Sequence, residues 1–504
     1  MANGLNKTER IAINTIIMYI RMIVVMAISL YTSRIVLRAL GIEDFGLYSV
    51  VGGVVGLFAF LRTSMEKATQ RFLNVEMARV KGDINRIFCV NVTIHIFISF
   101  AILVFAESVG LWFLNSYIDI PQERELAANI VYQTVVFSLC ITVISVPYSA
   151  CIVAYEKMGV YAYISIFDSF LKLIIAYWVL VINHDHLIIY GLLMMMVSFV
   201  NYIFYFCFCR KNYAETQYHF IFDIKKFREV FSFLSWTILG QISILGVTNG
   251  TAILINVFHG VVANAALSIG NQVNHAVTNL SSNFQTAFNP QITKAYASGD
   301  YTYLRKLMFS TSKISFFLLF LFSLPLIINI DAILAFWLDV VPVYANVFCV
   351  LCIINGILNA VSAPLNFGIM ATGRIKQFQI VTSSTYAIDL LIVLVLFKLG
   401  FPATTAMGVK VFFMSIIWFV RYWYAQKEIN CLNTKVYIVN VLLPILFVSI
   451  LTYALYWLLS CFASILWINV IVICLAVILI IFIGFSTQER AFITGMVRNK
   501  IKKK

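Results

Sequence analysis

The sequence predicts an all-α polytopic membrane protein with about fourteen transmembrane helices. Three observations predict this fold class: 62% of the 504 residues are hydrophobic, only 12% are charged, and the apolar residues gather in long runs. Soluble chains carry about 25% charged residues, so this chain could not cover a water-facing surface. The backbone has to satisfy its own hydrogen bonds in lipid, and we therefore expect the runs to be helical.

Each run is judged by length, because a helix needs about 20 residues to cross the hydrocarbon core. The first run is too long for a cleavable signal peptide and has no small-residue cleavage site, which indicates a spanning helix. The eighth is the most polar, being rich in Asn, Ser and Gln. The expected spans are 11–33, 44–61, 88–114, 127–153, 159–182, 187–209, 229–257, 262–285, 307–330, 343–371, 377–399, 403–424, 435–459 and 462–485.

Lys and Arg are concentrated in alternate loops, and this asymmetry orients the helices. Most of the 36 basic residues lie on one side, whereas Arg124 and acidic residues such as Asp185 and Asp339 lie on the other. We therefore expect both termini in the cytoplasm and interpret the net charge of +14 as a topology signal, not as a nucleic-acid footprint. The basic loops are expected to include Arg62, Lys67, Arg71, Arg79, Lys81, Arg86, Lys294 and Arg421.

Two segments recur at a spacing of 217 residues. Ala78–Asp83 and Ala295–Asp300 both read Ala-x-x-x-Gly-Asp, and residues 144–158 match residues 361–375 at a Ser, a Pro, an Ile and an Ala. The first phrase is expected to connect the second and third helices of each half. Because six spans separate equivalent points, equivalent helices run in the same direction, and the halves are expected to be parallel repeats.

The repeat predicts two six-helix lobes that suit alternating access around a cleft. Upstream, Gly41 aligns with Gly260 after a slip of two residues. The expected domains are an N-lobe over 1–210, a C-lobe over 211–430, two additional helices within 431–485 and a basic cytoplasmic tail over 486–504.

The chain resembles the multidrug/oligosaccharidyl-lipid/polysaccharide (MOP) flippase superfamily, and within it the Wzx-type polysaccharide flippases. The likeness rests on the stretches 32–54, 61–72 and 370–379 and on the repeated Gly-Asp connection. It implies a two-lobe transporter that moves an undecaprenyl-diphosphate-linked oligosaccharide from the cytoplasmic to the outer leaflet of a bacterial inner membrane. The resemblance also implies that the last two helices form a groove for the lipid tail.

Ionisable residues at membrane depth are costly and are functional candidates by default. Arg21 lies in the middle of the first span, Arg34 and Arg38 lie toward its outer end, and Arg62 lies at the inner end of the second. Arginine recognises phosphate oxygens through a planar fork, so these four residues are candidates to line a cationic cleft. The alternative is that Arg34, Arg38 and Arg62 extend to the interfaces as anchors.

Other polar residues are candidates for sugar binding or ion coupling. Asn249 and Asn271 lie in a cluster of amides in the seventh and eighth spans, which could bind sugars or hold helices together. Asp168 and Lys172 share one helix face and are expected to neutralise each other. Asp389 aligns with Lys172 in the repeat, and with Glu66 and Asp168 it is a candidate for H⁺ or Na⁺ coupling.

No metal site or cofactor is expected. The ten cysteines lie mostly within apolar runs, and the six histidines lack zinc-ligand spacing. Two alternatives stay open: a MATE-like ion-coupled drug efflux antiporter, and a membrane-embedded polysaccharide polymerase or ligase. The basic first helix disfavours the first, and the absence of a large outer loop disfavours the second. The expected partners are a lipid-linked oligosaccharide, membrane lipids and the polymerase or glycosyltransferases of the same pathway.

Overall fold

The chain forms two compact helical units, Ile11–Gln241 and Ile242–Lys504, the second including the first ten residues. The computed structural model describes residues 7–56, 59–79, 82–117, 120–221, 223–338, 341–429, 432–459, 465–486 and 490. Within these ranges every regular element is helical, which confirms the all-α prediction. Lys81, Asp339 and most of the basic tail lie outside the described residues.

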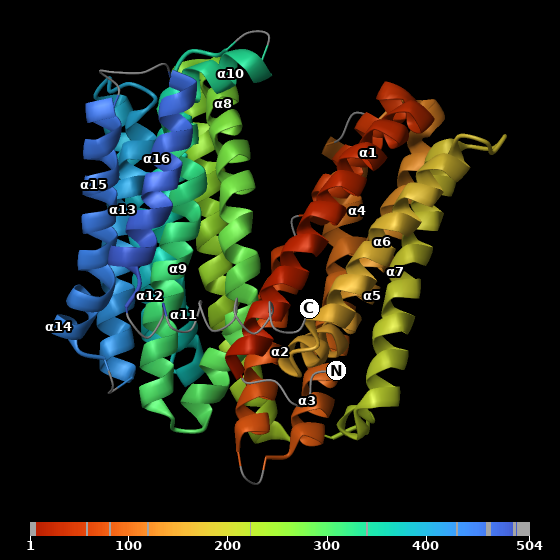
Figure 1. Cartoon of the computed structure of the whole chain (residues 1–504). Helices are drawn as coiled ribbons and strands as arrows, with labels where there is room; N and C mark the ends of the chain where they lie inside the picture. Colours follow the sequence, from red (N-terminus) through yellow and green to blue (C-terminus); the bar gives the residue numbers. More distant parts are fainter. Residues whose placement is uncertain are drawn as a thin grey trace, which may run out of the picture. The chain divides into compact units, whose positions relative to one another are not determined.

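The N-terminal unit is built from long helices that lie side by side along their lengths (Figure 1). Its central helix α5 packs against α2, α3, α6 and α7. The elements are α1 (Lys7–Gly56), α2 (Ala59–Ala78), α3 (Ile84–Phe105), the π-helix η1 (Ala106–Gly110), α4 (Leu111–Tyr117), the 3₁₀ turn η2 (Gln122–Arg124), α5 (Glu125–Ala154), α6 (Met158–Val179), α7 (His186–Asn212), the 3₁₀ turn η3 (Ala214–Thr216) and the first part of α8 (Ile224–Ala297).

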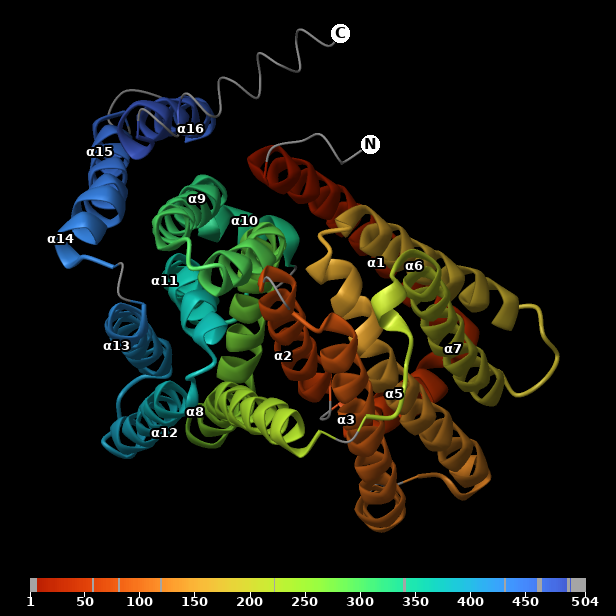
Figure 2. The same cartoon turned by 90° about the horizontal axis from the view of Figure 1, so that it is seen from below.

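The C-terminal unit repeats this plan around α11 and adds two helices. Figure 2 shows α15 and α16 at the edge of the unit beside α9, and both contact α9. The elements are the remainder of α8, α9 (Tyr301–Ile328), α10 (Ile330–Trp337), α11 (Ala345–Thr372), α12 (Lys376–Lys398), α13 (Thr405–Glu428), α14 (Thr434–Tyr437), the π-helix η4 (Ile438–Leu442), α15 (Leu443–Leu459), α16 (Ile465–Leu479) and the π-helix η5 (Ile480–Gly484).

Each of the two longest helices is broken by one glycine. Gly41 in α1 has φ 76° and ψ 174°, and Gly260 in α8 has φ 81° and ψ 178°. A side chain would strain this backbone conformation, which only glycine adopts freely. The two breaks correspond in the internal repeat, so each half begins with two helices joined at a glycine.

The number of apolar helices agrees with the fourteen spans expected from the sequence. Eleven helices among the described residues are long and apolar enough to cross a membrane, with α8 counted as one. One further helix beyond the Gly41 break, one beyond the Gly260 break and the shorter apolar helix Ile471–Gly484 bring the number to fourteen.

The repeated Ala-x-x-x-Gly-Asp phrase is a helix-to-helix connection in both units. Asp83 caps α3 by accepting a hydrogen bond from the Arg86 N–H, and Asp300 caps α9 by accepting one from the Tyr303 N–H. Aspartate is a preferred N-cap residue because its carboxylate satisfies a free N–H of the first turn. The predicted role of the phrase is therefore confirmed.

Two predicted helix ends were wrong. The second span was expected to end at residue 61 and the eighth at residue 285, but α2 continues to Ala78 and α8 to Ala297. Charged and polar side chains in these last turns were interpreted as loop residues. Arg62, Lys67 and Arg71 instead lie on α2, because a helix can leave the apolar layer and continue in the polar zone.

The segment between the two repeats, residues 213–221, is held against α3 by side-chain hydrogen bonds. We call this set of bonds the strap. Asn85 donates hydrogen bonds to the carbonyls of Glu215 and Gln217, both at 2.8 Å. One turn later Cys89 donates to the Gln217 carbonyl at 3.4 Å and accepts from the His219 N–H. Because these side chains are four residues apart, they lie on one face of α3 and fix the connection along it.

Candidate functional site

Arg21 faces the interior of the N-terminal unit. Its guanidinium carbon lies 4.9 Å from the centre of the Tyr161 ring, which belongs to α6. One turn earlier, Met18 is buried against Val153 and Met158 and so fixes this face of α1 toward α6. The Arg21 Nε atom is buried and has no hydrogen-bond partner among the described residues, which is costly for a polar group and makes the residue a candidate for a functional role.

Arg62 and Glu66 of α2 join Arg21 at the same place. Both interact electrostatically with the Tyr161 hydroxyl and with that of Tyr205 on α7, as does Arg21. We call these five residues the Arg21–Arg62 cluster. Its two guanidinium groups and one carboxylate give a formal charge of +1, contributed by α1 and α2 and surrounded by tyrosines from α6 and α7.

This cluster has the chemistry of an anion site. Guanidinium groups bind phosphate oxygens by paired, charge-assisted hydrogen bonds. Tyrosine hydroxyls donate further hydrogen bonds, and tyrosine rings offer faces on which sugars or cations pack. A net positive charge within a membrane-spanning bundle is costly without a partner, so the cluster favours an anionic ligand.

The other two predicted arginines lie elsewhere on α1. Arg34 and Arg38 are exposed, and at 1.5 Å per residue they lie about 20 and 26 Å along the helix from Arg21. Arg38 interacts electrostatically with Tyr177, whose hydroxyl pairs with that of Tyr31 at 2.7 Å. The structure therefore brings Arg21 and Arg62 together and leaves Arg34 and Arg38 apart from them.

Asp168 and Lys172 form the expected pair. Lys172 Nζ donates to one carboxylate oxygen of Asp168 at 2.8 Å, and Asn201 of α7 donates to the other at 2.6 Å. Both oxygens are thus engaged, and the pair joins α6 to α7.

Asp389 lies inside the C-terminal unit. It is only 2% exposed, and its Oδ1 atom has no hydrogen-bond partner among the described residues. Lys410 on the neighbouring helix α13 interacts electrostatically with both Asp389 and Cys352. Asn271 accepts a weak hydrogen bond from the Cys352 thiol at 3.8 Å, whereas Asn249 is exposed and lies outside this group.

Sequence reasoning misplaced Arg421 and missed Lys410 and Lys313, a buried residue of α9 whose Nζ donates to the Gly484 carbonyl at 3.4 Å. Arg421 was expected in a cytoplasmic loop, but it is a buried residue of α13 and donates to Asn359 Oδ1 at 2.9 Å and to Ser362 Oγ at 2.6 Å. The prediction was wrong because α13 continues to Glu428 and polar groups of α11 accept hydrogen bonds from one Nη atom of the guanidinium, whereas its Nε atom is buried without a partner among the described residues.

A family model described as polysaccharide biosynthesis protein matches residues 11–296. This chain belongs to that family. No curated protein matches the sequence. The likeness of this polysaccharide biosynthesis protein to solved structures is in the fold.

Three solved structures are similar in fold to this polysaccharide biosynthesis protein. A MATE transporter in the bent conformation matches with a TM-score of 0.71 and 12% identity over 84% of this chain and 96% of that one. An outward-facing multidrug resistance MATE family transporter of the MOP superfamily gives 0.69 and 10% over 85% and 97%. The Vibrio cholerae MATE transporter VcmN in its bent form gives 0.68 and 12% over 85% and 99%.

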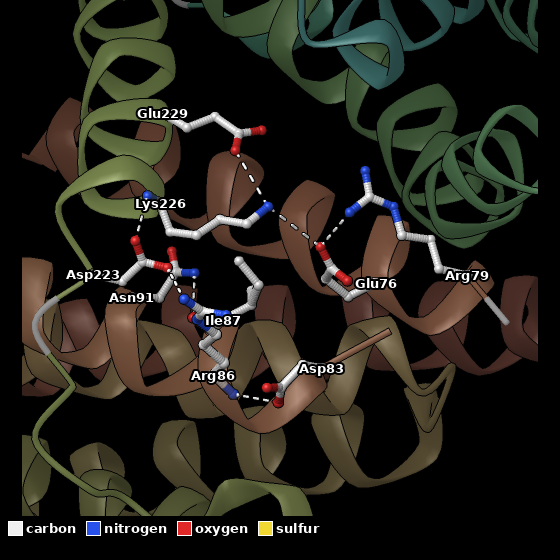
Figure 3. A network of polar contacts seen from close by, with 9 residues as sticks. All are labelled: Glu76, Arg79, Asp83, Arg86, Ile87, Asn91, Asp223, Lys226 and Glu229. Atoms are coloured by element: carbon white, nitrogen blue, oxygen red, sulfur yellow. Dashed lines mark hydrogen bonds and ion pairs between the residues drawn. The ribbon is translucent and has the colours of Figure 1, made fainter. Parts of the chain in front are cut away.

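A second charged group of this polysaccharide biosynthesis protein joins α2, α3 and the start of α8 (Figure 3). Buried Glu76 accepts from Arg79 at 2.7 Å and lies 3.6 Å from Lys226 Nζ. Asp223 pairs with Arg86 at 2.7 Å. The backbone N–H of Lys226, together with Arg86, holds the pKa of Asp223 below its ordinary value. Because its charges are paired, this group is structural and fixes the start of α8.

The described residues contain no group of three or more His, Cys, Asp or Glu side chains that could hold a metal ion. The family model is described as polysaccharide biosynthesis protein, and the solved structures that share the fold are MATE transporters. The Arg21–Arg62 cluster is thus the principal candidate site of the N-terminal unit.

Proposed function

We propose that the chain is a flippase for an undecaprenyl-diphosphate-linked oligosaccharide. It would move this lipid from the inner to the outer leaflet of a bacterial cytoplasmic membrane for the synthesis of a surface polysaccharide such as lipopolysaccharide O-antigen. Family membership supports a role in polysaccharide biosynthesis, and the shared fold supports transport. The Arg21–Arg62 cluster carries the proposal for the substrate class.

Charge is the reason for choosing this substrate. A diphosphate diester brings two negative charges, and the cluster offers a formal charge of +1. Two unit charges 4 Å apart interact by about 4 kcal/mol at an effective dielectric constant of 20. One net positive charge therefore suffices to favour an anionic headgroup over a cationic compound.

The proposed transport cycle is alternating access. The internal repeat supports it, because two like-oriented six-helix halves can expose a site to one leaflet and then to the other. In this scheme Arg21 and Arg62 hold the diphosphate. The glycosyltransferases of the same pathway supply the lipid-linked sugar, and the polymerase consumes it. Both termini are proposed to lie in the cytoplasm.

Coupling to H⁺ or Na⁺ is a further part of the proposal. Asp389 is the strongest candidate, because it is buried and one carboxylate oxygen has no partner. Asp168 is weaker, since Lys172 and Asn201 engage both of its oxygens. Transport in imposed pH and Na⁺ gradients should lose its gradient dependence in Asp389→Asn and keep it in Asp168→Asn. Unchanged dependence in Asp389→Asn would remove this residue from the scheme.

The second candidate function is a MATE-like ion-coupled drug efflux antiporter. The observation that favours it is the fold, which solved MATE transporters share over most of the chain. Export of a cationic drug would place that drug next to two arginines. The two functions therefore differ in the charge of the ligand, and this difference can be tested.

The test compares Arg21→Ala and Arg62→Ala with Arg34→Ala, an exposed arginine of the same helix as Arg21. Each lost arginine–phosphate contact is worth about 1.5–3 kcal/mol, or roughly ten- to hundredfold in affinity. Binding of undecaprenyl diphosphate by purified protein and surface polysaccharide in cells should fall for the first two variants at normal protein level. Arg34→Ala should retain both.

Two results would contradict the proposal. Full polysaccharide and unchanged diphosphate binding in Arg21→Ala and Arg62→Ala would remove the cluster from the substrate site. Raised drug sensitivity in cells that lack the protein, with normal polysaccharide, would favour the antiporter.

A further inference from the structure

His186 makes two contacts with backbone carbonyls at the end of the N-terminal unit where α1 is broken. Its Nδ1 atom lies 2.9 Å from the carbonyl oxygen of Ala39, and its Nε2 atom lies 3.0 Å from that of Ile182. Ala39 belongs to α1, whereas Ile182 belongs to the turn between α6 and α7. One imidazole therefore bridges two segments that are 143 residues apart in the chain.

Both partners of the ring are acceptors, and this fixes the protonation state that the geometry needs. A backbone carbonyl has no proton to give, and a neutral imidazole carries only one N–H. The two contacts can both be hydrogen bonds only when His186 is the imidazolium ion. When the ring is neutral, one carbonyl faces a nitrogen lone pair and that contact is lost.

The helix break explains why a carbonyl is available at Ala39. In a continuous helix this oxygen would accept the N–H four residues later. The chain departs from helical geometry at Gly41, so carbonyls of the preceding turn lose their partners. His186 acts as a side-chain cap for one of them, two residues from the break.

The charges around His186 come from each segment packed there. Asp44 and Glu43 follow the break, Arg124 comes from the start of α5, and Asp185 precedes His186. Arg124 bridges Asp44 at 2.9 Å and Asp185 at 2.5 Å. His184 lies in the same turn and is exposed. Arg124 pairs with two of the carboxylates, and Glu43 adds a third negative charge that acts on Asp44, so a positive charge on His186 reduces the local excess of negative charge.

The second half has the same helix break without this contact. A histidine also lies beside the Gly260 break, but it does not bridge two carbonyls: the His259 ring packs edge-on against Phe397 with the ring centres 4.5 Å apart, and its Nε2 atom has no hydrogen-bond partner among the described residues. The break itself therefore does not require a histidine bridge of the kind that His186 makes in the N-terminal unit.

We propose that His186 is a proton-operated latch that holds the Gly41 break of α1 against the start of α7. The protonated ring closes the latch by binding Ala39 and Ile182 together. Loss of the proton opens it, because one of the two contacts no longer holds. This inference does not depend on the transported substrate.

The test is hydrogen–deuterium exchange of the full chain in detergent or nanodiscs at pH 5.5 and 8.5, a range over which a free imidazole loses its proton. After correction for the intrinsic pH dependence of exchange, amides in 41–48 and 183–190 should lose roughly ten- to hundredfold protection at the higher pH, the effect of one charged hydrogen bond. Amides after Gly260 should show no such change.

Two variants complete the test. His186→Asn should show low protection in these segments at both pH values, whereas His184→Asn, a change in the same turn, should behave like the parent protein. If His186→Asn does not fold, His186→Gln replaces it, since its amide can still serve one carbonyl. The proposal is overturned if the parent protein shows no pH-dependent protection, or if removing the imidazole leaves that dependence intact.

Discussion

Replacing glycine by alanine at the two helix breaks should destabilise the protein, whereas the same replacement at Gly46 and Gly246 of the same helices should not. Gly41 and Gly260 have φ near 80° and ψ near 180°, a region that costs other residues about 1–3 kcal/mol. A Cβ built at either position meets no atom within 4 Å. The expected loss therefore comes wholly from backbone strain and not from a side-chain clash.

The structure supplies a matched control in each helix. Gly46 of α1 and Gly246 of α8 also have no atom within 4 Å of a built Cβ, but their backbone is helical. Alanine in a helix is favoured over glycine by about 0.5–1 kcal/mol. The Gly41→Ala and Gly46→Ala variants should therefore differ by about 1.5–4 kcal/mol in unfolding free energy.

Denaturant unfolding in mixed micelles, followed by tryptophan fluorescence, measures this difference. Gly260→Ala and Gly246→Ala provide the same comparison in the C-terminal unit. If Gly41→Ala and Gly46→Ala unfolded with free energies equal to within about 0.5 kcal/mol, the scale of an ordinary surface substitution, the argument that the break requires glycine would be wrong.

Three further outcomes are expected. The pKa of Asp223 is lowered in the folded state, first by the Lys226 N–H, so its contribution is present above about pH 4 and is lost as pH falls through the lowered value; Asp223→Asn should flatten the pH dependence of unfolding, and an unchanged profile would contradict this. Tyr132→Phe removes the hydroxyl that donates to the Ala106 carbonyl of η1 at 2.7 Å and leaves the Leu111 N–H as a donor to that oxygen; it should cost about 1 kcal/mol in unfolding free energy, whereas an equally stable variant would show that the bond is not needed. Gly356→Ala puts a Cβ 2.3 Å from a side-chain amide oxygen of α8 and should lower the unfolding free energy of the protein by about 1–3 kcal/mol. If the variant unfolded on heating at the same temperature as the parent protein, this expectation would be wrong.

The class of the fold and the candidacy of Arg21 could be predicted from the sequence because both follow from the cost of placing polar or charged groups in lipid. Arg21 stood out because a charge within an apolar run is expensive in lipid. Tyr161 and Tyr205 could not be predicted as its neighbours, since tyrosine is frequent and carries no such cost. Their place depends on which faces of α6 and α7 turn toward α1, and that is decided by packing.

Arg421 and Lys410 of the C-terminal unit show where the assignment of basic residues to loops fails. Arg421 was assigned to a loop because it lies among basic residues near the end of a span. Its partners Asn359 and Ser362 are about sixty residues earlier, and no local pattern links them. Lys410 was missed for the same reason, since its acidic neighbour Asp389 lies on another helix.

The strap between α3 and the connection that follows α7 determines where the polypeptide can be divided for expression as two fragments. A cut at residue 212 would place Asn85 and the carbonyls of Glu215 and Gln217 on different chains. A cut after Phe220, between these contacts and the start of α8, would leave the whole strap on the first fragment and α8 unbroken. Complementation by two separately translated pieces should therefore succeed with the later junction and fail, or need much higher expression, with the earlier one.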